Sequence, residues 1–155
     1  MSLAGITEEA LHHLWKTQAF GRLPLRTTAG AEVVVHNQGV YNTDAGPDFS
    51  AARLVIDGVS WAGDIELHIL SSMWRQHGHH ADAAYNKVIL HVVWQHDEEV
   101  LRQDGTTLPT LVLQPYVKDG WLSRYRSLQA SLTPVPCAPF YAGIEPLHRL
   151  EAFNK

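Results

Sequence analysis

The sequence predicts an α/β fold, a sandwich of helices around a mixed central sheet, and three observations carry this prediction. An amphipathic helix pattern opens the chain, strands with hairpin signals follow, and a continuous apolar run lies beyond a polar segment. Such an order of helices and strands is typical of layered α/β domains. With 155 residues, of which 45% are hydrophobic and 18% charged, the chain is long enough for one domain with a buried core.

The first element is a helix predicted over residues 7–19. A threonine at its start is a suitable N-cap, and Glu8 and Glu9 suit the positive end of the helix dipole. Leu11 and Trp15 recur at helical spacing, and Glu8 shares their inward stripe, whereas Glu9 points to another side. An inward carboxylate at a helix start makes Glu8 a candidate functional residue.

A three-strand antiparallel meander is predicted next. Its first strand is the valine-rich segment 32–36, and a loop rich in Gly, Asn and Asp separates it from the second strand. The dipeptide Asp57-Gly58 is a strong hairpin signal and joins the second strand to the third. These two strands are expected over residues 49–56 and 60–70.

The second half of the chain is predicted to complete the sheet. A polar, His-rich segment contains a short helix, and the apolar run after it is typical of a strand buried on both faces. A further strand and a helix then close the domain. The expected elements are the polar segment 71–87 with its short helix at 80–85, the buried strand 88–94, a strand at 108–117 and a helix at 120–132.

Two regions are predicted along the chain: an α/β domain over residues 1–132, and a Pro-rich linker with the start of a helical region over residues 133–155. We expect the natural protein to continue beyond this point. Cys137 is the one cysteine, so an internal disulfide is excluded and a reducing, cytoplasmic setting is expected. No segment reads as a secretory signal or a membrane span.

Charge argues against one class of function. The formal net charge is −4, whereas proteins that bind nucleic acid through a broad positive field carry an excess of Lys and Arg. The chain instead holds ten histidines, whose chemistry can serve metal binding or proton transfer. Their positions therefore decide what they indicate.

Side-chain alternation gathers polar groups on one face of the predicted hairpin. Because successive residues of a strand point to opposite faces, odd and even positions separate. The odd positions form a mostly apolar face that we expect to pack inward: Phe49, Ala51, Val55, Val59, Trp61, Ile65, Leu67 and Ile69. The even positions on the opposite face include Asp48, Asp64, Glu66 and His68.

The register of the hairpin decides whether Asp48 joins this face. A three-residue loop over 57–59 would place Asp48 opposite His68, with both side chains pointing the same way. A two-residue turn would send Asp48 to the other face unless a β-bulge restored the phase. We expect the longer loop or a bulge.

Two converging carboxylates predict a cation. Asp48 and Glu66 would repel one another unless a metal ion lay between them, and hard oxygen ligands favour Mg²⁺ or Mn²⁺. His68 would then position water, stabilise charge or bind the metal. The alternative is a solvated polar face of an antiparallel sheet.

The order of these motifs resembles the PD-(D/E)XK phosphodiesterase superfamily, which has the restriction-endonuclease-like fold. The resemblance rests on Pro47-Asp48, on Glu66-Leu67-His68 after a hairpin, and on a preceding helix with Glu8. It implies that Asp48 and Glu66 hold the metal, that Glu8 completes the site, and that DNA or RNA is the substrate. His68 stands where the superfamily has a lysine that assists the attacking water.

A second resemblance is to a bacterial family of unknown function, over most of residues 7–117. It rests on segments 42–49, 61–68 and 77–93, with sequences NTDAGPDF, WAGDIELH and HGHHADAAYNKVILHVV. The resemblance implies that the members of that family are longer than this chain. The resemblance adds no activity of its own.

The His-rich segment offers another candidate site. His77, His79, Asp82 and Tyr85 could support the metal from the edge of the sheet, or His77, His79 and Asp82 could bind zinc directly, because transition metals favour imidazole. A polar loop that caps a helix is the alternative. His91 is expected to be a hydrogen-bonded core residue.

Two other groups are expected to be structural. His12 and His13 are predicted to lie on an exposed side of the first helix. Four tryptophans are predicted to serve core and rim packing rather than base stacking: Trp15, Trp61, Trp74 and Trp94.

The sequence thus leaves three functions open. The first is a metal-dependent phosphodiesterase that acts on nucleic acid, with Asp48, Glu66 and Glu8 as ligands and His68 at the attacking water. The second is a catalytically degenerate nuclease-like module that binds a partner or nucleic acid. The third is a zinc-dependent hydrolase centred on the His-rich segment.

Overall fold

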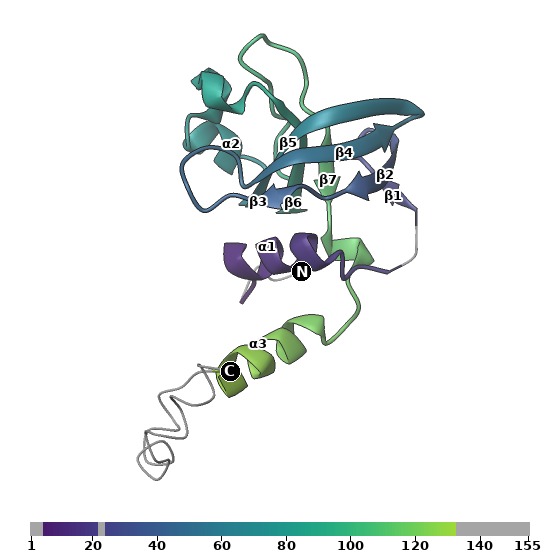
Figure 1. Ribbon diagram of the computed structural model, residues 1–155, viewed down its shortest axis with the longest axis vertical. Helices are drawn as coiled ribbons and strands as arrows, with labels where there is room; N and C mark the ends of the chain where they lie inside the picture. The colour runs from purple at the N-terminus through teal and green to yellow at the C-terminus, as the bar shows by residue number, and fades with distance from the viewer. Residues whose placement is uncertain (1–4, 22–23, 133–155) are drawn as a thin grey trace, which may run out of the picture. The chain divides into compact units, whose positions relative to one another are not determined.

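The computed structural model describes residues 5–21 and 24–132. The chain divides into two compact units, residues 1–119 and 120–155. The first holds a seven-stranded sheet with the helices α1 and α2, and the second holds α3, Trp121–Leu132 (Figure 1). The linker and helical start predicted at 133–155 lie outside the described residues. Among those residues, no helix has the length and apolarity needed to cross a membrane.

Helix α1 spans Glu8–Thr17 and confirms the predicted first element. Thr7 Oγ1 accepts a hydrogen bond from the backbone nitrogen of Ala10 at 3.1 Å, which satisfies one of the free donors at the helix start. The helix ends at Gln18, which adopts the left-handed conformation typical of a C-terminal cap. Its buried stripe consists of Ala10, Leu11, Leu14 and Trp15.

The sheet is mixed, as predicted, with the strand order β1-β2-β4-β5-β6-β7 and β3 paired to β4. Strands β2, β4 and β5 form an antiparallel meander, whereas β5, β6 and β7 run parallel. The strands are β1 Leu25–Arg26, β2 Glu32–Asn37, β3 Val40–Tyr41, β4 Phe49–Ile56, β5 Val59–Leu70, β6 Val88–Gln95 and β7 Thr110–Val112.

Short elements account for most differences from the prediction. The two-residue strand β1 was not predicted and β3 falls in the predicted loop, because such short segments carry no periodicity. The strand expected at 108–117 shrinks to β7, because Pro115 lies in a 3-10 turn, η3. The short helix expected at 80–85 is instead three turns: α2 Met73–Gln76, η1 His79–Ala81 and η2 Ala83–Tyr85.

A β-bulge sets the phase of the β4–β5 hairpin. The turn is the two-residue Asp57-Gly58, since Ile56 pairs with Val59, and both turn residues have positive φ, as a type I′ turn requires. The bulge then falls between Phe49 and Ala52. Of the two arrangements left open by the sequence, the structure has the bulge.

The bulge also reverses which side of β4 is buried. Beyond it, the buried residues are Ala52, Leu54 and Ile56, so the expectation of an inward odd face is wrong there. On β5 the odd positions Val59 and Trp61 are 54% and 45% exposed. The expected inward odd face is confirmed at Phe49, Ile65 and Leu67, which are buried.

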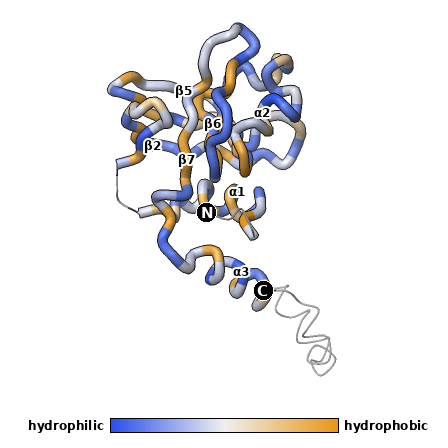
Figure 2. Tube along the Cα trace, turned by 180° about the vertical axis from the view of Figure 1, so that it is seen from behind, coloured by the Kyte–Doolittle hydropathy of each residue, from blue (hydrophilic) through white to orange (hydrophobic). Residues whose placement is uncertain are grey.

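Both faces of β5 are covered between Ile65 and His68. Helix α1 packs on this strand. Figure 2 shows hydrophobic residues along both α1 and β7. The segment after β5 forms a second small core around Trp74, in which Val88, Val100 and Leu108 are buried and Tyr85 packs against them. A polar side chain in this stretch of β5 therefore lies in the protein interior.

Candidate metal centre

Reciprocal hydrogen bonds bring Asp48 and Glu66 together. The backbone nitrogen of Asp48 donates to Glu66 Oε2 at 3.0 Å, and the backbone nitrogen of Leu67 donates to Asp48 Oδ2 at 3.0 Å. Both contacts follow from the bulge, because it places the start of β4 beside Glu66. The structure thus joins the two carboxylates that the sequence singled out.

Glu66 is buried, and its surroundings raise the pKa of its carboxyl group. It is 5% exposed, and burial, followed by the negative charge of Asp48, raises its pKa to about 9. Its Oε1 atom lies 3.3 Å from His79 Nε2 and 3.6 Å from His68 Nε2. This is no solvated sheet face, so that alternative is excluded for Glu66 and His68.

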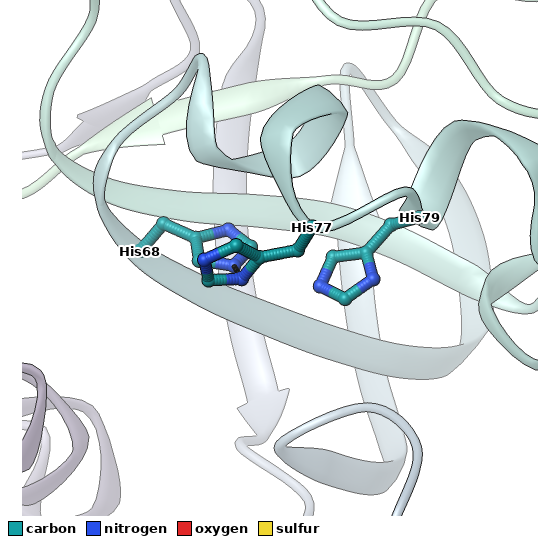
Figure 3. Close-up of side chains that lie close together, drawn as sticks. All are labelled: His68, His77 and His79. Atoms are coloured by element: carbon teal, nitrogen blue, oxygen red, sulfur yellow. Dashed lines mark hydrogen bonds between the residues drawn. The ribbon is translucent and has the colours of Figure 1, made fainter.

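Three histidines converge beside Glu66 (Figure 3). His68 comes from β5, while His77 and His79 come from the turns that follow α2. His68 Nε2 lies 3.2 Å from His77 Nδ1, and one nitrogen of each ring lies within 4.8 Å of the others. His68 and His79 are buried and His77 is exposed, so the cluster can hold a metal ion at a place that reaches solvent.

The turn that carries His77 and His79 is anchored to the end of β6. Asp97 accepts hydrogen bonds from the hydroxyls of Ser71 and Ser72, at 2.9 and 2.6 Å. Gly78 has a φ of 76°, which lets the chain reverse between the two histidines. The two imidazoles are thereby aimed at the same place.

His91 fixes the orientation of His68. His91 Nε2 lies 2.8 Å from His68 Nδ1, and His91 is fully buried, as expected for a core histidine. Burial, followed by the neighbouring histidines, lowers the pKa of His68 to about 2 and that of His91 to about 3. Both rings are therefore neutral near pH 7, and a proton on His68 Nδ1 would leave the lone pair of Nε2 for a cation.

His79 is held between aromatic rings. Its imidazole stacks on Tyr85 with ring centroids 3.7 Å apart and lies edge-on to Trp74. His79 Nε2 is buried and has no hydrogen-bond partner, although Glu66 Oε1 is 3.3 Å away. A buried nitrogen without a partner is costly, and a metal bond would satisfy it.

The spacing of the donor atoms suits one metal ion. Ligands at 2.0–2.2 Å from a shared ion lie about 3.0–3.6 Å apart. The separations along the series His77 Nδ1, His68 Nε2, Glu66 Oε1 and His79 Nε2 are 3.2, 3.6 and 3.3 Å. The three histidines thus fit one cation, and the carboxylate of Glu66 lies beside two of them.

His12 is a residue of this site that the sequence analysis missed. Its Nε2 lies 3.2 Å from Asp48 Oδ2 and its Nδ1 lies 3.4 Å from the hydroxyl of Tyr41. Burial lowers the pKa of His12, but the hydrogen bond and charge of Asp48 outweigh it, and the pKa is raised. The expectation of a solvated His12 is wrong. Its position four residues after Glu8, on the same helix face, was the available signal.

The other candidate residues lie outside this cluster. Glu8 is half-buried and acts on Glu66 and His12 through its charge, and the structure gives it no direct contact with Asp48. The side chain of Asp82 is exposed and caps η2 by accepting from the nitrogen of Ala84 at 2.9 Å. Among the described residues, the His cluster therefore includes His68 where the zinc prediction had Asp82.

Asp64 and Tyr85 differ in how close they come to the centre. Asp64 is half-buried, and its backbone nitrogen donates to the carbonyl of Lys87 at 2.8 Å. Burial, followed by the charge of Glu66, raises the pKa of Tyr85 to about 12. Tyr85 thus belongs to the wall of the site, whereas Asp64 lies beside it.

Comparison with protein families adds one finding. The model of a family described as a protein of unknown function, DUF2851, matches residues 8–155. The chain belongs to this family. No curated protein and no solved structure matches the chain significantly. The family description states no activity, so the likeness to the PD-(D/E)XK superfamily stays a prediction.

Proposed function

We propose that the chain is a metal-dependent phosphodiesterase that acts on nucleic acid. One observation carries the proposal: Glu66, a buried carboxylate, has one oxygen beside His68 and His79 and the other on the backbone of Asp48. Such a group is stabilised in its charged form by a cation. Metal centres lined by carboxylate and imidazole are typical of hydrolases.

The donor set favours a transition-metal ion. Three imidazoles suit Zn²⁺ or Mn²⁺ better than Mg²⁺, which prefers oxygen ligands. When bound, the cation would lower the pKa of a coordinated water and polarise the phosphoryl oxygen. The exposed His77 leaves this side of the cluster accessible to a substrate.

Different residues of the chain would bind the ion and orient the groups around it. Glu66, His68, His77 and His79 would hold the ion, and Asp48 would orient the groups beside it. His68 is buried and bonded through Nδ1, so it serves as a ligand rather than in place of the superfamily's lysine. Nucleic acid as the substrate rests on the likeness of the Pro47-Asp48 and Glu66-Leu67-His68 motifs to the PD-(D/E)XK superfamily.

A nuclease-like module without catalytic activity is the second candidate. The observation that favours it is His68 itself, because a neutral, enclosed imidazole lacks the charge and reach of lysine. Such a module would bind metal or nucleic acid and leave the phosphodiester intact.

Activity with matched variants tests the proposal. The full chain is loaded with Mn²⁺, Zn²⁺ or Mg²⁺ and assayed on single- and double-stranded DNA and RNA. We expect cleavage with Mn²⁺ or Zn²⁺, and its loss in Asp48→Asn and His79→Ala. Asp64→Asn, a matched loss of charge on β5, should keep it. Metal binding without any cleavage would favour the second candidate, and undiminished cleavage by His79→Ala would refute the proposed centre.

A further inference from the structure

A series of close polar contacts links helix α1 to the metal centre, and the proposed function assigns no role to its first two members, Tyr41 and His12. His12 Nδ1 lies 3.4 Å from the Tyr41 hydroxyl, and His12 Nε2 lies 3.2 Å from Asp48 Oδ2. The backbone nitrogen of Asp48 donates to Glu66 Oε2 at 3.0 Å. The series therefore runs from β3 through α1 to the buried carboxylate of the metal centre.

The contact between His12 and Asp48 lies where β4 leaves the sheet. The last pair between β4 and β5 is Phe49 with Ile65, so the backbone nitrogen of Leu67 has no strand beside it. It donates instead to Asp48 Oδ2 at 3.0 Å, which satisfies a donor that would otherwise be unpaired. The same oxygen faces His12. The side chain of Asp48 thus takes the place of the missing strand, and α1 covers it.

Tyr41 decides which nitrogen of His12 faces Asp48. The ring centroids of His12 and Tyr41 are 5.5 Å apart, with the hydroxyl of Tyr41 beside Nδ1. A hydroxyl that donates to Nδ1 leaves the ring hydrogen on Nε2, the nitrogen beside Asp48. The contact with Asp48 therefore does not require a charge on His12.

Helix α1 is fixed to the turn between β2 and β3, and this keeps His12 in place. Trp15 Nε1 donates to the carbonyl of Gln38 at 3.0 Å, and Gln38 Nε2 donates to the carbonyl of Lys16 at 3.1 Å. The side chains of His12 and Asp48 are only 17% and 21% exposed. His12 is therefore held against Asp48 by the packing of its own helix.

We propose that His12 is a positioning residue of the metal centre and acts through Asp48. It keeps the Asp48 carboxylate on the amide of Leu67. The backbone nitrogen of Asp48 in turn holds Glu66 in place beside the histidines. Partners that orient the groups of a metal site typically contribute about 10–100-fold to metal affinity. The inference rests on the proposed function for the use of the metal and makes a separate statement about how the centre is held.

Metal affinity tests the inference without an activity assay. The full chain and its variants are titrated calorimetrically with Mn²⁺ and with Zn²⁺. We expect His12→Leu to weaken binding about ten-fold, the lower end for a group that orients a metal site. His12→Gln, whose amide can donate to Asp48, should recover most of the loss, and Tyr41→Phe should lose less than His12→Leu. His36→Leu, at an exposed histidine on β2, is the matched control and should stay within about two-fold.

A double-mutant cycle shows whether His12 acts through Asp48. Asp48→Asn keeps an oxygen for the amide of Leu67 and removes the carboxylate that His12 faces. If His12 acts through this carboxylate, the double variant should bind metal no worse than Asp48→Asn alone. A residue that only stabilises the fold would give additive losses and a matching fall in the melting temperature of the metal-free protein.

The inference is overturned by wild-type affinity in His12→Leu, by additive losses in the cycle, by no recovery in His12→Gln, or by an equal loss in His36→Leu. Absence of metal binding by the wild type overturns it together with the proposed centre. If the variants follow the expected pattern but no metal supports cleavage, the inference stands and the proposed phosphodiesterase fails. Cleavage that requires His79, with a metal affinity indifferent to His12, has the opposite meaning.

Discussion

The two halves of β5 show how one strand can serve two purposes. Residues 65–68 are buried on both faces, and this stretch carries Glu66 and His68 in the interior. Residues 59–62 are exposed, and this stretch carries Trp61 at the rim of an open hollow. Polar groups in the covered half need partners because water cannot reach them, whereas those in the open half do not.

The largest effect is expected for Glu66→Gln in the covered half. The amide keeps the shape of the side chain and loses the charge that a cation requires, so we expect metal affinity to fall at least 100-fold and cleavage to disappear. Isothermal titration with Zn²⁺ and Mn²⁺ measures the change. Unaltered affinity would show that metal binding does not need the charge of Glu66 in the covered half of β5.

A smaller loss is expected for His91→Leu, which removes the partner of His68 Nδ1. Groups that orient metal ligands typically contribute about 10–100-fold to metal affinity. His91→Gln, which can keep a hydrogen bond to Nδ1, should recover part of the loss in the same titration. If both variants bind metal like wild type, His91 does not position His68.

Stability of the metal-free protein should depend on pH in two directions. The pKa of Glu66 is raised to about 9, so its contribution is complete below about pH 4.5 and is lost as the pH rises toward 9. The pKa values of His68 and His91 are lowered to about 2 and 3, so their contribution is complete above about pH 6.5 and is lost as the pH falls. These three groups together predict a maximum near pH 6.5.

Thermal melts in EDTA at pH 5.5, 6.5 and 8.5 check this dependence. Glu66→Gln should abolish the loss of stability above pH 6.5, and so should added metal in the wild type. A metal-free protein that grows more stable from pH 6.5 to 8.5 would contradict the assignment of Glu66 as a protonated, buried acid.

The bulge offers a more modest test. Ala51 has a φ of 57°, a conformation that costs an alanine more than a glycine. Ala51→Gly should raise the free energy of unfolding by about 0.5–1 kcal/mol. Deletion of residue 51 should remove the extra residue of the bulge and leave Phe49 paired with Ile65, so Asp48 should stay beside Glu66 and metal-dependent activity should remain. Chemical denaturation measures the first effect, and loss of activity in a folded deletion variant would refute the register argument.

The smallest effect is expected in the open half. Val59 is 54% exposed, so Val59→Thr should change the free energy of unfolding by less than about 0.5 kcal/mol. The same denaturation experiment measures it. A loss of more than 1 kcal/mol would show that this half of β5 is covered in solution.

Much of the fold follows from local patterns. The helix α1, the limits of β4 and the buried run of β6 were predicted because capping, alternation and continuous apolarity act within a few residues. The bulge in β4 was left open, since its extra residue, Ala51, carries no distinguishing side chain. The sequence analysis therefore expected the odd-numbered residues of β4 to face inward beyond Ala51, where the even-numbered residues are the buried ones.

The candidate site was predicted in its strand residues and less well in the rest. Glu66 and His68 share a face by alternation, which the sequence shows directly, whereas Asp48 joins them through the bulge that the sequence left open. The addition of His77 and His79 depends on how the turns after α2 fold over the sheet, a tertiary effect. His12 was assigned to the solvent because its position on the face of Glu8 does not by itself reveal that Asp48 lies against it.

The most direct test of the metal centre is a crystal structure of the full chain grown with Zn²⁺ or Mn²⁺, with anomalous diffraction measured at the metal edge. The account predicts one strong peak within bonding distance of His68 Nε2, His77 Nδ1, His79 Nε2 and Glu66 Oε1. A peak held by other residues, or no peak at these four atoms in a crystal that contains millimolar metal, would contradict it.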